Sequence, residues 1–120
     1  MNTLLYNINL IHAHRTMQCY NLTVYIRHAN HIVINNINPA DAGAQLLIVS
    51  QFTLWADCRS RRPGFTAAAR PDTAIPLYER VQEVCRSRGF TVETGEFGAD
   101  MQVASVNDGP VTIILDTREL

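Results

Sequence analysis

The chain has 120 residues, of which 47% are hydrophobic and 18% charged, and its formal net charge at pH 7 is −1. These values are typical of one globular domain, which at this length buries about two-thirds of the surface that its unfolded chain exposes. Near neutrality excludes a strong overall attraction to nucleic acid, and no apolar run reaches the roughly 18 residues of a transmembrane helix. We therefore predict a single domain over residues 1–120.

The N-terminal segment and the cysteines favour a cytoplasmic protein. Residues 1–12 lack both a positively charged start and an unbroken apolar stretch, so no secretory signal is expected. The three cysteines show no CxxC spacing, which favours reduced thiols over a disulfide framework: Cys19, Cys58 and Cys85.

The histidines raise the question of a metal site. His12 and His14 form an HxH pair, and His28 and His31 follow in the sequence. No carboxylate lies near any of them, so surface histidines are the simpler interpretation. We predict neither a metal ion nor a cofactor.

Alternating β-branched and aromatic residues predict strands through the first part of the chain, at roughly 3–11, 21–27 and 31–37. The residue types of 38–43, NPADAG, predict a turn before a strand at about 45–54. Residues 56–71 form a polar, proline-containing loop in which 65–69 could make a short helical turn.

The clearest helix spans residues 73–88, with Asp72 as its N-cap, Pro76 in its first turn and Gly89 as its C-cap. An apolar stripe at helical spacing predicts its buried face, and it makes Cys85 a small core residue: Leu77, Tyr78, Val81, Val84 and Cys85. Three further strands are expected at about 90–94, 101–106 and 111–116. The predicted fold is α+β, mostly strand, with one long helix.

The stretch LIVSQFTLW, residues 47–55, breaks an apolar run with Ser50 and Gln51. A buried hydroxyl and amide need hydrogen-bond partners, or else they face a pocket. Ser50 could be a nucleophile, but a nucleophilic serine needs a nearby base. No GxSxG motif surrounds it, and a triad with one of the histidines has no support in the sequence.

Two other segments admit both a structural and a functional interpretation. All ten basic residues are arginines, and three of them cluster in the polar loop: Arg59, Arg61 and Arg62. This cluster could contact phosphate groups of a nucleic acid, or it could be an ordinary solvated surface. Asp108-Gly109 is a strong hairpin signal, yet Pro110 cannot donate a hydrogen bond to a following strand. About 5% of X-Pro bonds in folded proteins are cis.

Five segments in one order carry a resemblance to a known family: SQFTL (50–54), RRP with Phe65, LYE (77–79), GEFGADMQV (95–103) and NDGPVT (107–112). Together they resemble the D-aminoacyl-tRNA deacylases. The resemblance covers residues 41–116, whereas residues 1–40 do not carry the family's motifs.

The resemblance implies a homodimeric α+β fold with a mixed, mostly antiparallel, barrel-like sheet that hydrolyses the ester between a D-amino acid and tRNA. It implies that the Gln51 side chain and the Phe52 N–H hold the substrate carbonyl, that Ser50 supports them and that Thr112 lines the pocket. Gly109 and Pro110, as a Gly-cis-Pro element, would enter the partner's pocket and exclude L-amino acids.

The remaining roles that the resemblance implies concern substrate and RNA contacts. Asn107 and Met101 would contribute to substrate binding, and Arg59, Arg61 and Arg62 would contact the acceptor stem. Neither a metal nor a cofactor is implied. Two alternatives stay open: a catalytically silent relative that binds tRNA or a protein partner, and a serine esterase that uses Ser50.

Overall fold

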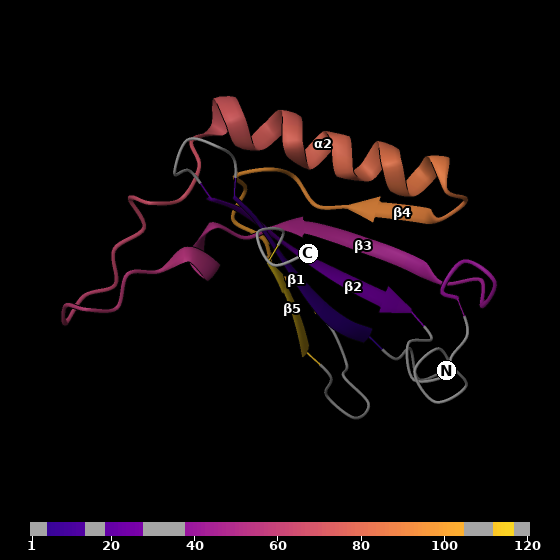
Figure 1. The fold of residues 1–120 in the computed structure, drawn as a ribbon, viewed down its shortest axis with the longest axis horizontal. Coiled ribbons are helices and arrows are strands. Elements are labelled where there is room, and N and C mark those ends of the chain that lie inside the picture. Colours follow the sequence, from indigo (N-terminus) through magenta and orange to yellow (C-terminus); the bar gives the residue numbers. More distant parts are fainter. Residues whose placement is uncertain (1–4, 14–18, 28–37, 105–111, 117–120) are drawn as a thin grey trace.

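A computed structural model describes residues 5–13, 19–27, 38–104 and 112–116. Its strands form a five-stranded sheet in the order β4-β3-β2-β1-β5, with one long helix, α2, beside it (Figure 1). The elements in chain order are β1 (Leu5–Ala13), β2 (Cys19–Arg27), β3 (Gln45–Ser50), the 3-10 helix η1 (Phe52–Trp55), α2 (Pro71–Ser87), β4 (Thr91–Thr94) and β5 (Thr112–Asp116). The α+β class and the single long helix are as predicted. No helix in these ranges is both long and apolar enough to cross a membrane.

The sheet is mixed, with antiparallel pairings at its centre and parallel pairings at both edges. β1 pairs with β2, and β2 with β3, in antiparallel fashion, whereas β5 pairs with β1 and β4 with β3 in parallel. The predicted predominance of antiparallel pairing therefore holds for the three central strands. The parallel pair β3–β4 needs a crossover connection, and α2 supplies it.

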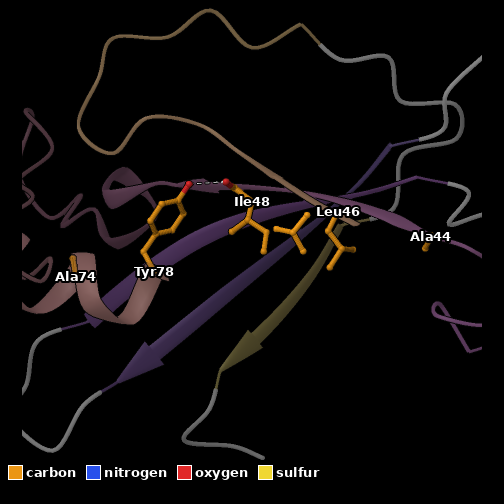
Figure 2. Close-up of a cluster of buried hydrophobic side chains, with 6 residues drawn as sticks. Ala44, Leu46, Ile48, Ala74 and Tyr78 are labelled. Carbon is orange, nitrogen blue, oxygen red and sulfur yellow. Dashed lines mark hydrogen bonds between the residues drawn. The ribbon is translucent and has the colours of Figure 1, made fainter. Parts of the chain in front are cut away.

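The core lies between β3, β4 and α2. Leu46 and Ile48 of β3 pack with Tyr78 of α2 (Figure 2) and with Val92 of β4, and the adjacent Val49 is also buried. Ile48 is completely buried. The predicted helix stripe is confirmed in part, since Tyr78 is buried and the partly buried members pack against this cluster: Leu77, Val81 and Cys85.

The start of α2 differs from the prediction. The helix begins at Pro71 with Arg70 as its N-cap, so Asp72 is a first-turn residue and not the cap. A proline at the first helical position needs no partner for its missing N–H, which lets the helix start earlier than the Asp72 signal indicated. Pro76 consequently lies inside the helix, beyond the first turn.

The end of α2 is close to the prediction. Arg88 is the C-cap, and Gly89 follows it with φ +88°. The Gly89 N–H donates to Arg86 O at 3.0 Å and the Phe90 N–H to Cys85 O at 3.2 Å. This hydrogen-bond pair is a Schellman motif, in which glycine provides the left-handed residue.

Two predicted strands are wrong in part. The strand predicted at 45–54 is confirmed for Gln45–Ser50 only, because residues 52–55 form η1, and residues 101–104 of the strand predicted at 101–106 have no regular secondary structure. From these two segments Phe52, Met101 and Val103 line a pocket. The predicted turn at 38–43 is confirmed, and residues 65–68 form one turn closed by Ala68 N–H to Phe65 O at 3.1 Å. The strand predicted at 31–37 lies outside the described residues.

Candidate functional site

A pocket of about 240 Å³ lies between two chain segments. We call them the first wall, Val49, Ser50, Gln51 and Phe52, and the second wall, Gly98, Ala99, Asp100, Met101 and Val103. The first wall covers the carboxyl end of β3 and the residues after it, and the second follows the carboxyl end of β4. Because β3 and β4 are parallel, their carboxyl ends meet at one edge of the sheet, where α/β folds commonly bind ligands.

The first wall explains the polar break in LIVSQFTLW. Ser50 is the last residue of β3, and Gln51 adopts φ −147° and ψ 87° before η1 begins. Both side chains are half-buried, and the Gln51 amide donates to the Thr53 hydroxyl. Phe52 is the first residue of η1, so its N–H has no acceptor within the helix. Gln51 and Phe52, the second of which carries this helix-terminal N–H, thus line one side of the pocket.

Ser50 lacks the surroundings of a serine nucleophile in the part of the pocket that the structure describes. No histidine or lysine is among the lining residues, and Asp100 is their one titratable side chain. A serine needs a base within hydrogen-bond reach to attack an ester.

Met101 holds its place in the second wall through the residues that follow β4. Its Sδ accepts a contact from the Glu96 N–H at 3.4 Å. Gly95 leaves room for the same side chain, since a Cβ at that position would lie 2.8 Å from Met101 Sδ and 3.8 Å from Val49 Cγ1. Gly95 is thus packed between the two walls.

Sequence reasoning identified Met101 but assigned no role to the other second-wall residues or to Gly95. The only signal for them was the segment GEFGADMQV, which the resemblance quoted as a unit. Gly98 has φ +76°, in the left-handed region that favours glycine, and it turns the chain as the second wall begins.

The polar loop projects from the sheet as an arm, which we define as residues 56–65 (Figure 1). Asp57 and Gly64 pair through two backbone hydrogen bonds of 2.8 and 2.9 Å, which close its base. Phe65 meets Phe52 edge to face, with ring centroids 5.3 Å apart, so the arm joins the rim of the pocket. The Phe52 ring remains 59% exposed.

The three arginines of the arm are not equivalent. Arg59 pairs with Asp57 through two guanidinium nitrogens, at 2.9 Å from Nε to Oδ1 and 2.6 Å from Nη2 to Oδ2. These hydrogen bonds lower the pKa of the Asp57 carboxyl and raise the pKa of Arg59. Arg61 and Arg62 are exposed further along the loop. The arm therefore presents two arginines beside a third that an acidic neighbour already engages.

The remaining predicted residues are placed only in part. Thr112 begins β5, opposite Asn7 of β1. Asn107, Gly109 and Pro110 lie outside the described residues, and with them the isomer of the Gly109-Pro110 bond. Within the described ranges no group of three His, Cys, Asp or Glu side chains could hold a metal ion.

Comparison with known proteins assigns the chain that carries this pocket to a family. The family model described as D-Tyr-tRNA(Tyr) deacylase matches residues 14–116, most of the chain. The chain belongs to this deacylase family. The match begins before residue 41, so it also includes part of the segment in which the sequence motifs were lacking.

Curated relatives of the deacylase family support the same assignment. The chain is 59% identical over 85 residues to a D-aminoacyl-tRNA deacylase of Thermus aquaticus, covering 70% of this chain and 56% of the relative. It is 53% identical over 85 residues to one of Geobacillus sp. (strain WCH70), with the same coverage of both chains. For one of Clostridioides difficile (strain 630) the identity is 54% over 85 residues, 70% of this chain and 57% of the relative. The chain thus spans a little over half the length of these relatives.

Proposed function

We propose that this member of the deacylase family hydrolyses the ester bond between a D-amino acid and the 3′ end of tRNA. The observation that carries the proposal is the first wall, where Gln51 and Phe52 line one pocket at the carboxyl end of β3. The names of the relatives, D-aminoacyl-tRNA deacylase, indicate the substrate.

The proposed reaction does not require a nucleophilic or basic side chain of the protein. A water molecule adds to the ester carbonyl carbon, and the carbonyl oxygen becomes an oxyanion held by the Phe52 N–H and the Gln51 amide. The bond to the ribose 3′ oxygen then breaks, that oxygen takes up a proton from the attacking water, and free D-amino acid and tRNA result. A preorganised oxyanion donor contributes about 3 kcal/mol to the transition state, or roughly a hundredfold in rate. The vicinal ribose hydroxyl of the RNA would assist, and Ser50 and Thr112 would line the site.

Chiral selection belongs to the same proposal. Gly109 and Pro110 of a second subunit would enter the pocket beside Met101, with Asn107 supporting the turn, and exclude an L side chain by steric contact. The functional molecule would then be a homodimer with each site completed across the interface, and residues 1–120 would act as one domain. The family's substrate makes the cytoplasm the expected location, and no cofactor is required.

Paired deacylation assays test the proposal. Purified protein is incubated with D-Tyr-tRNA and, separately, with L-Tyr-tRNA, and the release of tyrosine is measured over time. We expect release from the D form alone, whereas equal release from both forms, or none from either, would contradict the proposal. A dimer should appear in light scattering coupled to size-exclusion chromatography.

Variants at Ser50 and Gln51 separate the deacylase from a serine esterase. Ser50→Ala should retain most of the deacylase activity, because backbone and amide groups hold the oxyanion. Gln51→Leu should reduce kcat by about a hundredfold through loss of one oxyanion donor. Loss of all activity in Ser50→Ala would instead favour the esterase.

The N-terminal segment supports a second candidate, a catalytically silent deacylase relative that binds tRNA or a protein partner. Residues 1–40 do not carry the family's sequence motifs. Retention of tRNA in filter binding without turnover of either aminoacyl form would support that candidate.

A further inference from the structure

The buried side chain of Tyr78 contacts the segments that lead into the two walls of the pocket. Tyr78 of α2 is 5% exposed, and its hydroxyl lies 2.9 Å from the carbonyl oxygen of Ile48 and 3.3 Å from that of Gly95. The Gly95 N–H lies 3.4 Å from the same Ile48 oxygen. Figure 2 shows the Tyr78 hydroxyl directed at Ile48 from the helix. The Tyr78 hydroxyl and the Ile48 carbonyl therefore connect α2, the end of β3 and the segment after β4.

Each partner of the phenol is adjacent to a wall. Ile48 directly precedes Val49, where the first wall begins. Gly95 packs against Met101 of the second wall, and its neighbour Glu96 contacts the Met101 sulfur. A displacement at either carbonyl would consequently reach the pocket within one or two residues.

We propose that Tyr78 is a positioning residue that holds the two walls of the pocket at a fixed separation; this rests on the deacylase function proposed above. Tyr78 is not among the residues that line the pocket. Its ring packs in the core cluster, beside Phe97 with centroids 5.9 Å apart, and this packing does not require the hydroxyl. The hydroxyl contacts the carbonyls of Ile48 and Gly95, and these two residues are adjacent to different walls.

Tyr78→Phe isolates this role because it keeps the ring and removes the donor. Without the hydroxyl, the two carbonyls lose the single buried donor that they share, and the segments that carry them can separate. Misplaced donors weaken the transition state more than they weaken substrate binding. We expect kcat for D-Tyr-tRNA to fall about tenfold or more while KM changes by less than about threefold.

A second readout does not depend on catalysis. The chain has three methionines, Met1, Met17 and Met101, so protein labelled with ¹³C-methyl methionine gives few signals. Met101→Leu identifies the Met101 methyl resonance by its disappearance. Removing the Tyr78 hydroxyl should shift that resonance because Met101 packs on Gly95.

Leu77→Ala is the matched control. Leu77 is the neighbouring residue on α2 and packs partly buried against the same cluster, but its side chain cannot form a hydrogen bond to either wall. It should lower the thermal midpoint and leave both kcat and the Met101 resonance close to their wild-type values. If either variant unfolds at the assay temperature, the measurements are made in trimethylamine N-oxide, which favours the folded state.

The outcomes are separable. An unchanged Met101 resonance in Tyr78→Phe, or one that moves equally in Leu77→Ala, overturns the positioning role. So does a kcat loss that Leu77→Ala reproduces. If the wild-type protein cleaves neither enantiomer, the proposed function fails, and the methionine resonance alone still decides whether Tyr78 couples the walls.

Discussion

Gly95 is a single residue on which the width of the pocket depends. The space that its missing side chain leaves is filled by Met101, whose Sδ would lie 2.8 Å from an added Cβ. Its φ is outside the positive range, so alanine can adopt the backbone conformation without strain. The cost of a side chain there falls on the second wall, since the flexible end of Met101 has to move.

We therefore predict that Gly95→Ala changes the pocket more than the stability. The free energy of unfolding should change by less than about 1 kcal/mol, because alanine also reduces the entropy of the unfolded chain. KM for D-Tyr-tRNA should rise several-fold as Met101 shifts, which steady-state kinetics would measure. Gly64→Ala is the control, because no atom lies within 4 Å of a Cβ there. Equal kinetics in the two variants would contradict the prediction.

Two titratable side chains of the core, the buried Tyr78 and the partly buried Cys85, predict how stability depends on pH. Burial raises the pKa of Tyr78 above its ordinary value of 10.0 and that of the Cys85 thiol above 9.0. Each group therefore keeps its proton to higher pH in the folded state than in the unfolded chain. The stability that these two groups contribute is consequently constant below about pH 9 and falls as pH rises above it.

Urea unfolding under reducing conditions between pH 8 and pH 11 would measure this slope. Cys85→Ala should remove the decline that begins near pH 9, and Tyr78→Phe the part that begins near pH 10. A free energy of unfolding that does not change with pH in the wild-type protein would contradict the assignment.

At the scale of the element, α2 carries an internal conflict. Pro71 suits the first helical position, but Pro76 lies further in, where its ring removes an N–H that would bond to Asp72 O and crowds that carbonyl. The Schellman motif at Gly89 ends the same helix with a favourable cap. The C-terminal end of α2 is thus well capped, whereas Pro76 destabilises its interior.

Pro76→Ala should stabilise the protein. Pro76 is exposed, so the substitution leaves the core unchanged and restores one helical hydrogen bond. We expect the free energy of unfolding to rise by about 1–3 kcal/mol, measured by urea denaturation. Gly89→Ala should act in the opposite sense, by about 1–2 kcal/mol, because alanine is strained at φ +88°. A loss of stability in Pro76→Ala would show that the proline rigidifies the start of the helix.

At the scale of the whole molecule, a nearly neutral chain concentrates positive charge on the arm. Asp57 engages Arg59, so Arg61 and Arg62 are the arginines best placed for phosphate contacts. The Phe52–Phe65 contact joins the arm to the pocket rim, so an RNA held by the arm could place its 3′ end at the pocket.

Replacing both Arg61 and Arg62 by Gln should weaken tRNA binding and reduce its salt dependence. Each lost phosphate contact should lower the slope of log affinity against log salt by about 1. Filter binding at several salt concentrations measures that slope. Arg80→Gln is the control, since Arg80 is an exposed arginine on α2, paired with Glu83 at 3.1 Å. An equal effect of the control would assign the binding to overall charge.

The sequence predicted the fold class, most strand positions and one wall of the pocket, where local patterns determine structure. Alternation identified β1 and β2, an apolar run identified β3, and the stripe around Tyr78 identified the face of α2. The prediction from sequence failed where tertiary contacts override the local pattern. The residues of LIVSQFTLW were predicted to continue one strand to residue 54, but β3 ends at Ser50, beside the pocket. The role of Gly95 depends on Met101 and Val49 arriving from other segments, which periodicity cannot show.

The arm interrupts the chain between β3 and α2, and it divides the sheet in an uneven way. Everything before the arm supplies the three central strands and the first wall, and everything after it supplies both edge strands, β4 and β5, with the second wall. A protease that cuts after Arg59 or Arg61 would leave two pieces, neither with a whole pocket. The two pieces should stay associated, because the later one pairs with the earlier one at both edges of the sheet. The chain is therefore suited to a split protein, whose two parts are produced separately and form the pocket when mixed.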